Sequence, residues 1–201
     1  MTSILPASQV TLGILAGGLG ARLGGVDKAW LERDGLAQVL RWQRRFGDET
    51  AAVLVSANRD HGRYAQAGLR CVTDRVPGGQ GPLAGIDALA AACATPWLLT
   101  VPVDLIGVNE CLLPTLASAA GTVGAFAVDD DGPQPLVALW SLSALQPSLG
   151  AALARGEVAV HALQAALRMA AVRLDGVRFG NLNTPDDLAA AGITLPTWPR
   201  T

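Results

Sequence analysis

Short apolar runs of strand length alternate with longer Ala- and Leu-rich stretches along most of this chain. Continuous apolar strands are typical of parallel sheets that are buried on both faces, with the intervening helices as the cover. We expect strands over residues 10–16, 51–57, 69–73, 97–103 and 171–175. We expect helices over residues 36–46, 61–66, 82–93, 111–120, 143–170 and 183–192. The alternation therefore predicts an α/β fold with a mainly parallel sheet and helices on both faces.

The second half of the chain departs from this pattern in one place. The segment GAFAVDDDGPQPLVALWS (124–141) predicts two strands joined by the turn-rich DDDGP, and so an antiparallel excursion added to the sheet. The last helix has a clear start signal, because Thr184 is a natural N-cap and Pro185 suits the first helical position. Asp186 and Asp187 then lie near the positive end of the helix dipole.

Length and charge exclude several classes of protein. The chain has 201 residues, enough for one domain with a large core, and 15 basic against 17 acidic residues give a net charge of −2. The densest basic segment, RWQRRF (41–46), predicts an amphipathic helix with a solvated face and not a nucleic-acid surface. Three cysteines without CxxC spacing argue against disulfides and zinc. With no signal peptide and no membrane-spanning run, we expect a cytoplasmic protein without membrane contact.

The glycine-rich loop after the first strand indicates a phosphate site. A Walker loop requires lysine directly after its last glycine, but here Gly25 is followed by Val26, so that interpretation fails. A dinucleotide-binding loop fits poorly, since three residues and not two separate Gly20 from Gly24. Glycines let backbone amides approach a nucleotide closely, and the loop also carries the basic residues Arg22 and Lys28. This arrangement suits a nucleoside triphosphate.

Polar residues follow the later strands at the ends where an open α/β sheet binds ligands. Asn58 and Asp74 end the second and third strands, and Asp104 follows the fourth. A single carboxylate such as Asp104 is a ligand that Mg²⁺ uses together with water and phosphate oxygens, although it can also cap the next helix. Gly81 precedes a predicted helix whose first amides can face the same ligand.

Motifs along nearly the whole chain resemble those of the molybdenum cofactor guanylyltransferases, a family of nucleotidyltransferases with a three-layer, Rossmann-like sheet. They are LAGGLGARLGGVDKAWL (15–31), VLVSANRD (53–60), VTDRVPGGQGPLAGI (72–86), LLTVPVD (98–104), QPLVALW (134–140) and FGNLNTPDDL (179–188). The resemblance implies one nucleotidyltransferase domain over residues 1–201, with a GTP-binding part at about 10–110 and an acceptor part at about 111–195. The chain departs from the family at Ile106, where a proline is usual.

The resemblance also implies a set of site residues. The residues expected to act in catalysis are Lys28, Arg22 and Asp104, with Asp104 also as the Mg²⁺ ligand. The GTP site would comprise Leu15, Ala16, Gly17, Gly18, Lys28, Asn58, Asp74, Gly81 and Asp104. The pterin site would comprise Gln134, Asn181 and Asn183, although Asn183 can equally be a structural residue before the last helix. Asp27 receives no role beyond orienting Lys28.

The activity implied by the resemblance is transfer of GMP from GTP to the phosphate of molybdenum-loaded molybdopterin, with release of pyrophosphate. Two alternatives stay open: a cytidylyltransferase acting on the same pterin, and a non-catalytic chaperone that binds the pterin and a nucleotide. The partners expected are GTP, molybdopterin, a molybdenum insertion protein and molybdoenzyme chaperones, with no nucleic acid. We expect a monomer.

Overall fold

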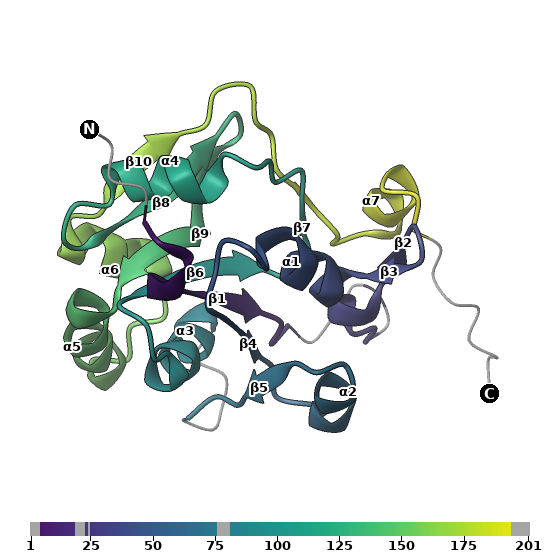
Figure 1. Cartoon of the computed structure of the whole chain (residues 1–201), viewed down its shortest axis with the longest axis horizontal. Helices are drawn as coiled ribbons and strands as arrows, with labels where there is room; N and C mark the ends of the chain where they lie inside the picture. Colours follow the sequence, from purple (N-terminus) through teal and green to yellow (C-terminus); the bar gives the residue numbers. More distant parts are fainter. Residues whose placement is uncertain (1–4, 19–22, 24, 76–80, 194–201) are drawn as a thin grey trace.

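A seven-stranded sheet forms the centre of the molecule in a computed structural model that describes residues 5–18, 23, 25–75 and 81–193 (Figure 1). The strand order is β10-β8-β9-β6-β1-β4-β5. The strands are β1 (Val10–Leu15), β4 (Ala52–Ser56), β5 (Arg70–Val72), β6 (Trp97–Pro102), β8 (Gly124–Asp129), β9 (Gly132–Ser141) and β10 (Ala170–Arg173). Only β9 runs antiparallel to its neighbours β6 and β8; the other pairs in this sheet are parallel. The predicted fold class, including the antiparallel excursion over 124–141, is confirmed.

Helices cover both faces of this sheet, as the apolar strands required. One face packs against α1 (Gln38–Phe46) and α4 (Leu112–Ala119), and α2 (His61–Gln66) adds the fully buried Tyr64 to that core. The other face packs against α3 (Pro82–Ala92), α5 (Leu142–Ala154) and α6 (Val160–Leu167). A smaller apolar cluster joins α7 (Pro185–Ala190) to the segment around Leu31. In the part of the chain that the structure describes, no helix is long and apolar enough to cross a membrane.

Small elements complete the fold beside the sheet. Short 3₁₀ turns in the described residues include η1 (Ala7–Gln9) and η3 (Lys28–Trp30). Two antiparallel pairs of short strands are β2 (Glu32–Arg33) with β3 (Leu36–Ala37), and β7 (Leu105–Ile106) with β11 (Gly180–Asn181). Ile106, which stands where the family usually has proline, pairs with Gly180 in the second of these.

Two sequence predictions are corrected by these elements. The helix expected from residue 36 begins at Gln38, because Leu36 and Ala37 pair with β2 across a turn in which Asp34 and Gly35 both have positive φ (53° and 71°). Asp-Gly favours such a hairpin turn. The single helical region expected over 143–170 is two helices, separated by a break after Ala154 in which Gly156 also has positive φ. The N-cap predicted at Thr184 is confirmed as a capping box with Asp187.

Candidate active site at the carboxyl edge of the sheet

Several of the predicted site residues lie at one edge of the sheet because the parallel strands β5, β4, β1 and β6 are neighbours and end at that edge. The chain moves from β5, at one side of β1, to β6, at its other side, so the strand order reverses around β1. Open α/β sheets bind ligands in the crevice at such a reversal. The loop after β1, together with Asn58, Asp74 and Asp104 after the other strands, lies at this edge.

A cluster of three side chains lies at the end of β6. The Lys28 ammonium donates to Asp104 Oδ2 at 2.7 Å and to Asn183 Oδ1 at 2.6 Å. The side chains of Lys28 and Asp104 are 17% and 21% exposed, so a ligand can still reach the pair. Hydrogen bonds to charged groups are short and strong, and these two fix the ammonium beside the sheet edge. The structure therefore joins three of the predicted site residues in one contact.

Asp27, for which no chemical role was predicted, stabilises the turn that contains Lys28. Its carboxylate is the N-cap of η3 and accepts from the backbone N–H of Ala29 at 3.0 Å. The phenol of the buried Tyr64 also donates to it, at 3.5 Å. Burial first, and then the negative charge of Asp27, raise the pKa of Tyr64 far above its ordinary value, so the phenol keeps its proton. Asp27 thus orients Lys28 through the backbone of the turn.

Asn58 and Asp74 form a second pair at the sheet edge. The Asn58 amide donates to Asp74 Oδ2 at 2.8 Å, and the Asp74 backbone N–H donates to Asn58 Oδ1 at 3.0 Å. Both hydrogen bonds are solvent-exposed. The pair links the ends of β4 and β5 and leaves Asp74 Oδ1 facing no partner among the described residues. A carboxylate oxygen in that position can accept from a ligand N–H.

Glycines bring backbone close to this pair. A Cβ placed on Gly17 would lie 4.0 Å from Asn58 Nδ2, and one on Gly18 would meet nothing within 4 Å. Both glycines are exposed, next to Leu15 and the buried Ala16. Gly81, before α3, has φ 62° and ψ −155°, which residues with a Cβ rarely adopt. Arg22, the other predicted basic residue, lies outside the described residues.

The structure treats the three predicted pterin residues differently. Asn183 belongs to the Lys28 cluster and also donates its backbone N–H to Asp187 at 3.0 Å, so its structural role before the last helix is confirmed and its contact with a pterin stays a prediction. Asn181 is exposed and pairs with Leu105, the residue after Asp104. Gln134 is not brought into the cluster by a hydrogen bond; its amide donates to Asp129 at 3.1 Å. Its role at a pterin site stays a prediction.

Two residues of α1 hold the backbone on both sides of Asp104. The side-chain amide of Gln38 donates to the carbonyl of Leu105 at 2.8 Å, and the indole of Trp42 donates to the carbonyl of Val103 at 3.3 Å. The carbonyl of Asp104 accepts from Leu182 at 2.9 Å. The sequence analysis missed Gln38 and Trp42. The available signal was a glutamine on the apolar face of a helix, where an unpaired amide would be costly.

The donor set fits magnesium better than a transition metal. The described residues include no group of three His, Cys, Asp or Glu side chains that could hold an ion. Asp104 therefore does not belong to a set of three such side chains among these residues. Magnesium is commonly held by one or two carboxylates and completed by water and substrate phosphates, whereas zinc sites need three or four protein ligands.

Comparison with known proteins gives one consistent family. The model of the MobA-like NTP transferase domain matches residues 12–172. The molybdenum cofactor guanylyltransferase of Cupriavidus taiwanensis is 36% identical over 196 residues, which cover 93% of this chain and 98% of that protein. The protein of the same name from Cereibacter sphaeroides is 41% identical over 190 residues, covering 90% and 95% of the two chains.

Solved structures share the fold. A molybdopterin-guanine dinucleotide biosynthesis protein A from Archaeoglobus fulgidus superposes with a TM-score of 0.68 at 20% identity, over 90% of this chain and 96% of that one. The 2-C-methyl-D-erythritol 4-phosphate cytidylyltransferase from Thermus thermophilus gives 0.67 at 21% identity, over 93% and 97%. At these identities the likeness concerns the fold alone, and it spans enzymes that use different nucleotides.

Proposed function

The chain belongs to the MobA-like nucleotidyltransferases, among relatives named molybdenum cofactor guanylyltransferase, and from this premise we propose that it transfers GMP from GTP to molybdenum-loaded molybdopterin. An oxygen of the terminal phosphate of the pterin attacks the α-phosphorus of GTP. The bond from that phosphorus to its bridging oxygen breaks, and the oxygen leaves on pyrophosphate. The product is the guanine dinucleotide form of the cofactor.

The cluster of Lys28, Asp104 and Asn183 is the observation that supports this proposal most directly. Phosphoryl and nucleotidyl transfer require little more from a protein than positioning and compensation of negative charge. Asp104 and Asn183 hold the Lys28 ammonium in a fixed position, so little reorganisation is needed when pyrophosphate charge develops. The attacking phosphate is already ionised and needs no general base.

Asp104 would hold a magnesium ion, which when bound supplies positive charge to the triphosphate and orients it. The amides of the loop after β1 would surround the phosphates, with Arg22 as a second cation. Asn58 and Asp74 would contact the base and ribose side, where the free carboxylate oxygen of Asp74 can accept a guanine N–H. Asn181, Asn183 and Gln134 would contact the pterin.

The test is release of pyrophosphate from GTP, with CTP and ATP in parallel, in the presence and absence of molybdenum-loaded molybdopterin and Mg²⁺. We expect release with GTP and the pterin together, and none when either is omitted. Release with CTP in preference to GTP would overturn the guanine assignment. Binding of GTP without pyrophosphate release would overturn the transfer reaction and favour a chaperone.

A further inference from the structure

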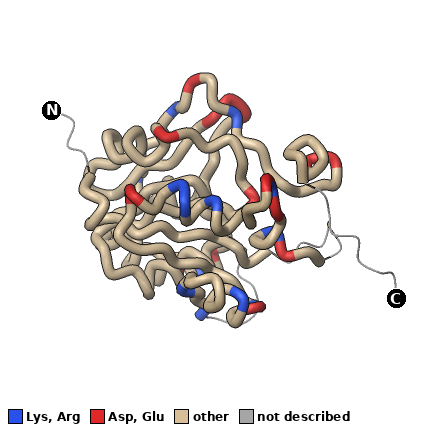
Figure 2. Tube along the Cα trace, turned by 45° about the vertical axis from the view of Figure 1, so that its right-hand side comes forward, with Lys and Arg blue, Asp and Glu red and all other residues tan. Residues whose placement is uncertain are grey.

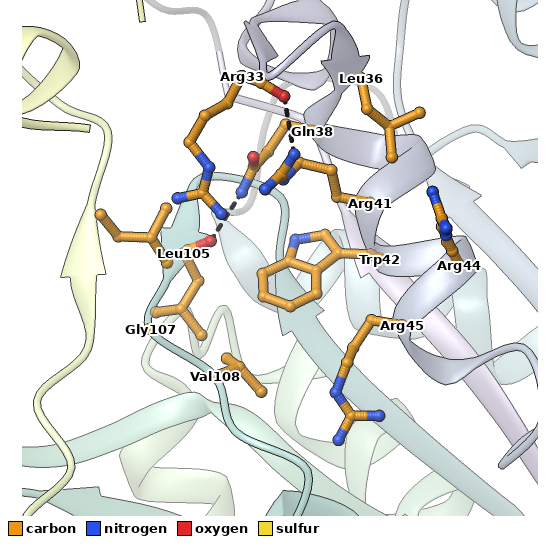
Figure 3. A pocket seen from close by; sticks show the side chains of 11 residues that line it. Arg33, Leu36, Gln38, Arg41, Trp42, Arg44, Arg45, Leu105, Gly107 and Val108 are labelled. Atoms are coloured by element: carbon orange, nitrogen blue, oxygen red, sulfur yellow. Dashed lines mark hydrogen bonds between the residues drawn. The ribbon is translucent and has the colours of Figure 1, made fainter. Parts of the chain in front are cut away.

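A hollow of about 350 Å³ lies between α1 and β7, on the side of the Asp104 segment that faces α1 (Figure 3). Its rim carries four arginines, and the apolar side chains of its wall include those of Leu36 and Val108. The arginines are Arg33, Arg41, Arg44 and Arg45. Neither the family resemblance nor the proposed transfer reaction gives this hollow a role.

Basic residues are more concentrated around this hollow than in the chain as a whole. The protein has a net charge of −2, yet four of its 15 basic residues surround this one space. Figure 2 shows basic positions gathered along α1. The sequence predicted a solvated face for RWQRRF, but the side chains of Arg41 and Arg45 are only 24% and 20% exposed. They line the hollow and do not simply extend into water.

The acidic partners of these arginines do not balance their charge. Glu49 pairs with Arg45. Arg33 and Arg41 share a single carboxylate oxygen of Asp34, at 3.9 Å and 3.4 Å, and Asp34 is 80% exposed. Among the described residues, no carboxylate lies within 4.0 Å of the Arg44 guanidinium. Two carboxylates thus face four guanidinium groups.

The fold holds two of these like charges close together. The guanidinium of Arg41 donates to the backbone carbonyl of Arg33 at 2.7 Å, which ties the helix to the β2–β3 hairpin. Burial, and then the charge of Arg41, lower the pKa of Arg33, with Asp34 opposing them. Keeping two cations together and partly out of water is unfavourable unless an anion joins them.

We propose that this hollow is a second anion site, which binds a small phosphate ester with its phosphate among the arginines and its organic part on the apolar wall. Guanidinium groups match phosphate oxygens in a bidentate manner. The volume is that of a small-molecule pocket, whereas an acidic protein partner would need a surface of about 800 Å². The bound ester would stabilise the arrangement in which Gln38 and Trp42 hold the backbone on both sides of Asp104.

Calorimetric titration with phenyl phosphate tests the site. The full chain carrying Lys28→Met is the background, because loss of the ammonium should weaken binding of the probe at the proposed GTP site. Inorganic phosphate tests the anion contribution alone and phenol the apolar contribution alone. We expect phenyl phosphate to bind more tightly than either, and Arg41→Gln to weaken it about tenfold or more, since a charge-assisted contact is lost.

Arg173→Gln is the matched control. Arg173 is the last residue of β10 and pairs with Asp130 and Asp175, which lie in loops away from the hollow. The substitution should leave the affinity unchanged. Arg44→Gln, at an exposed position, should weaken binding without disturbing the fold and carries the test if Arg41→Gln does not fold. Absence of phenyl phosphate binding in the background protein, or equal affinity in all the arginine variants, would overturn the proposal. Tighter binding of a short acidic peptide than of phenyl phosphate would also overturn it, in favour of a protein-docking role.

Discussion

Replacing Asp104 with asparagine should remove the transfer activity while leaving the fold in place. The substitution keeps the size of the side chain and an oxygen that can accept from Lys28, but it removes the negative charge. The backbone of the segment does not depend on that charge, because Gln38, Trp42 and Leu182 bond to the carbonyls of residues 103–105. Asparagine therefore separates the chemistry of the carboxylate from its contribution to structure.

The two effects differ greatly in expected size. The ion pair of Lys28 and Asp104 is mostly buried, but asparagine keeps an acceptor for the ammonium, so we expect a loss of about 1 kcal/mol in the free energy of unfolding. For a chain of this length, a loss of that size lowers Tm by about 2–4 °C at most. Loss of one preorganised charge at a reacting centre costs about 100-fold or more in kcat.

The assay is the rate of pyrophosphate release from GTP with the pterin acceptor at saturating Mg²⁺, alongside thermal unfolding of the same preparations. Asp186→Asn is the matched control, because Asp186 is an exposed acid in the first turn of α7 and belongs to neither the Lys28 cluster nor the Asn58–Asp74 pair. It should retain the rate of the unmodified protein. Turnover within a fewfold of normal in Asp104→Asn would refute the assignment of Asp104. A fall in Tm of 10 °C or more, on the order of several kcal/mol, would show that the carboxylate is mainly structural.

Three further outcomes follow from contacts in the fold. Gln38→Leu should lower kcat more than it raises KM for GTP, because the unpaired carbonyl of Leu105 costs about 1–3 kcal/mol and frees the Asp104 segment. Gln43→Leu on the same helix is the control. Equal kinetics in the two variants would argue against a role of Gln38 in positioning Asp104. Asp27→Ala should lower stability by about 0.5–2 kcal/mol and weaken GTP binding, whereas Asp27→Asn, which can still cap η3, should retain most of both, as measured by urea unfolding and nucleotide titration. Asp129 is fully buried, and although burial opposes it, hydrogen bonds from Phe179, Gln134 and the following turn lower its pKa. The ionised Asp129 therefore stabilises the fold above its unfolded-state pKa, and this contribution is lost as the pH falls through the lower folded-state pKa. In urea titrations, Asp129→Asn should therefore lose less stability than the unmodified protein below about pH 4. An unchanged pH profile would contradict this.

The sequence predicts the sheet well because strands that are buried on both faces consist almost entirely of apolar residues. Runs such as VTLGILA and WLLTVPV have no polar face, so only a covered strand suits them. Once these strands are parallel, Asn58, Asp74 and Asp104 must share an edge, and the structure places them there. Thr184 and Pro185 fix the start of α7 through local chemistry alone.

Contacts between distant loops are what the sequence could not predict. Asn183 meets Lys28 across 155 positions, and the spacing of residues along the chain does not record which loops fold over one another. The β2–β3 hairpin has two residues in each strand, too few for an alternating pattern. Gln38 has the periodicity of a core position but the chemistry of a surface residue, and its carbonyl partner carries no sequence signal at all.

The separation of Lys28 and Asn183 along the chain also determines when the Lys28 cluster can form during synthesis. At synthesis rates of about 5–20 residues per second, the lysine is synthesised about 8–30 s before the asparagine that completes its contacts. Asp104 and most of the strands of the sheet are synthesised during that interval, yet the ammonium has only one of its two side-chain partners until Asn183 is made. A nascent chain therefore has the residues around Lys28 early and completes the Lys28 cluster only after Asn183 has been synthesised.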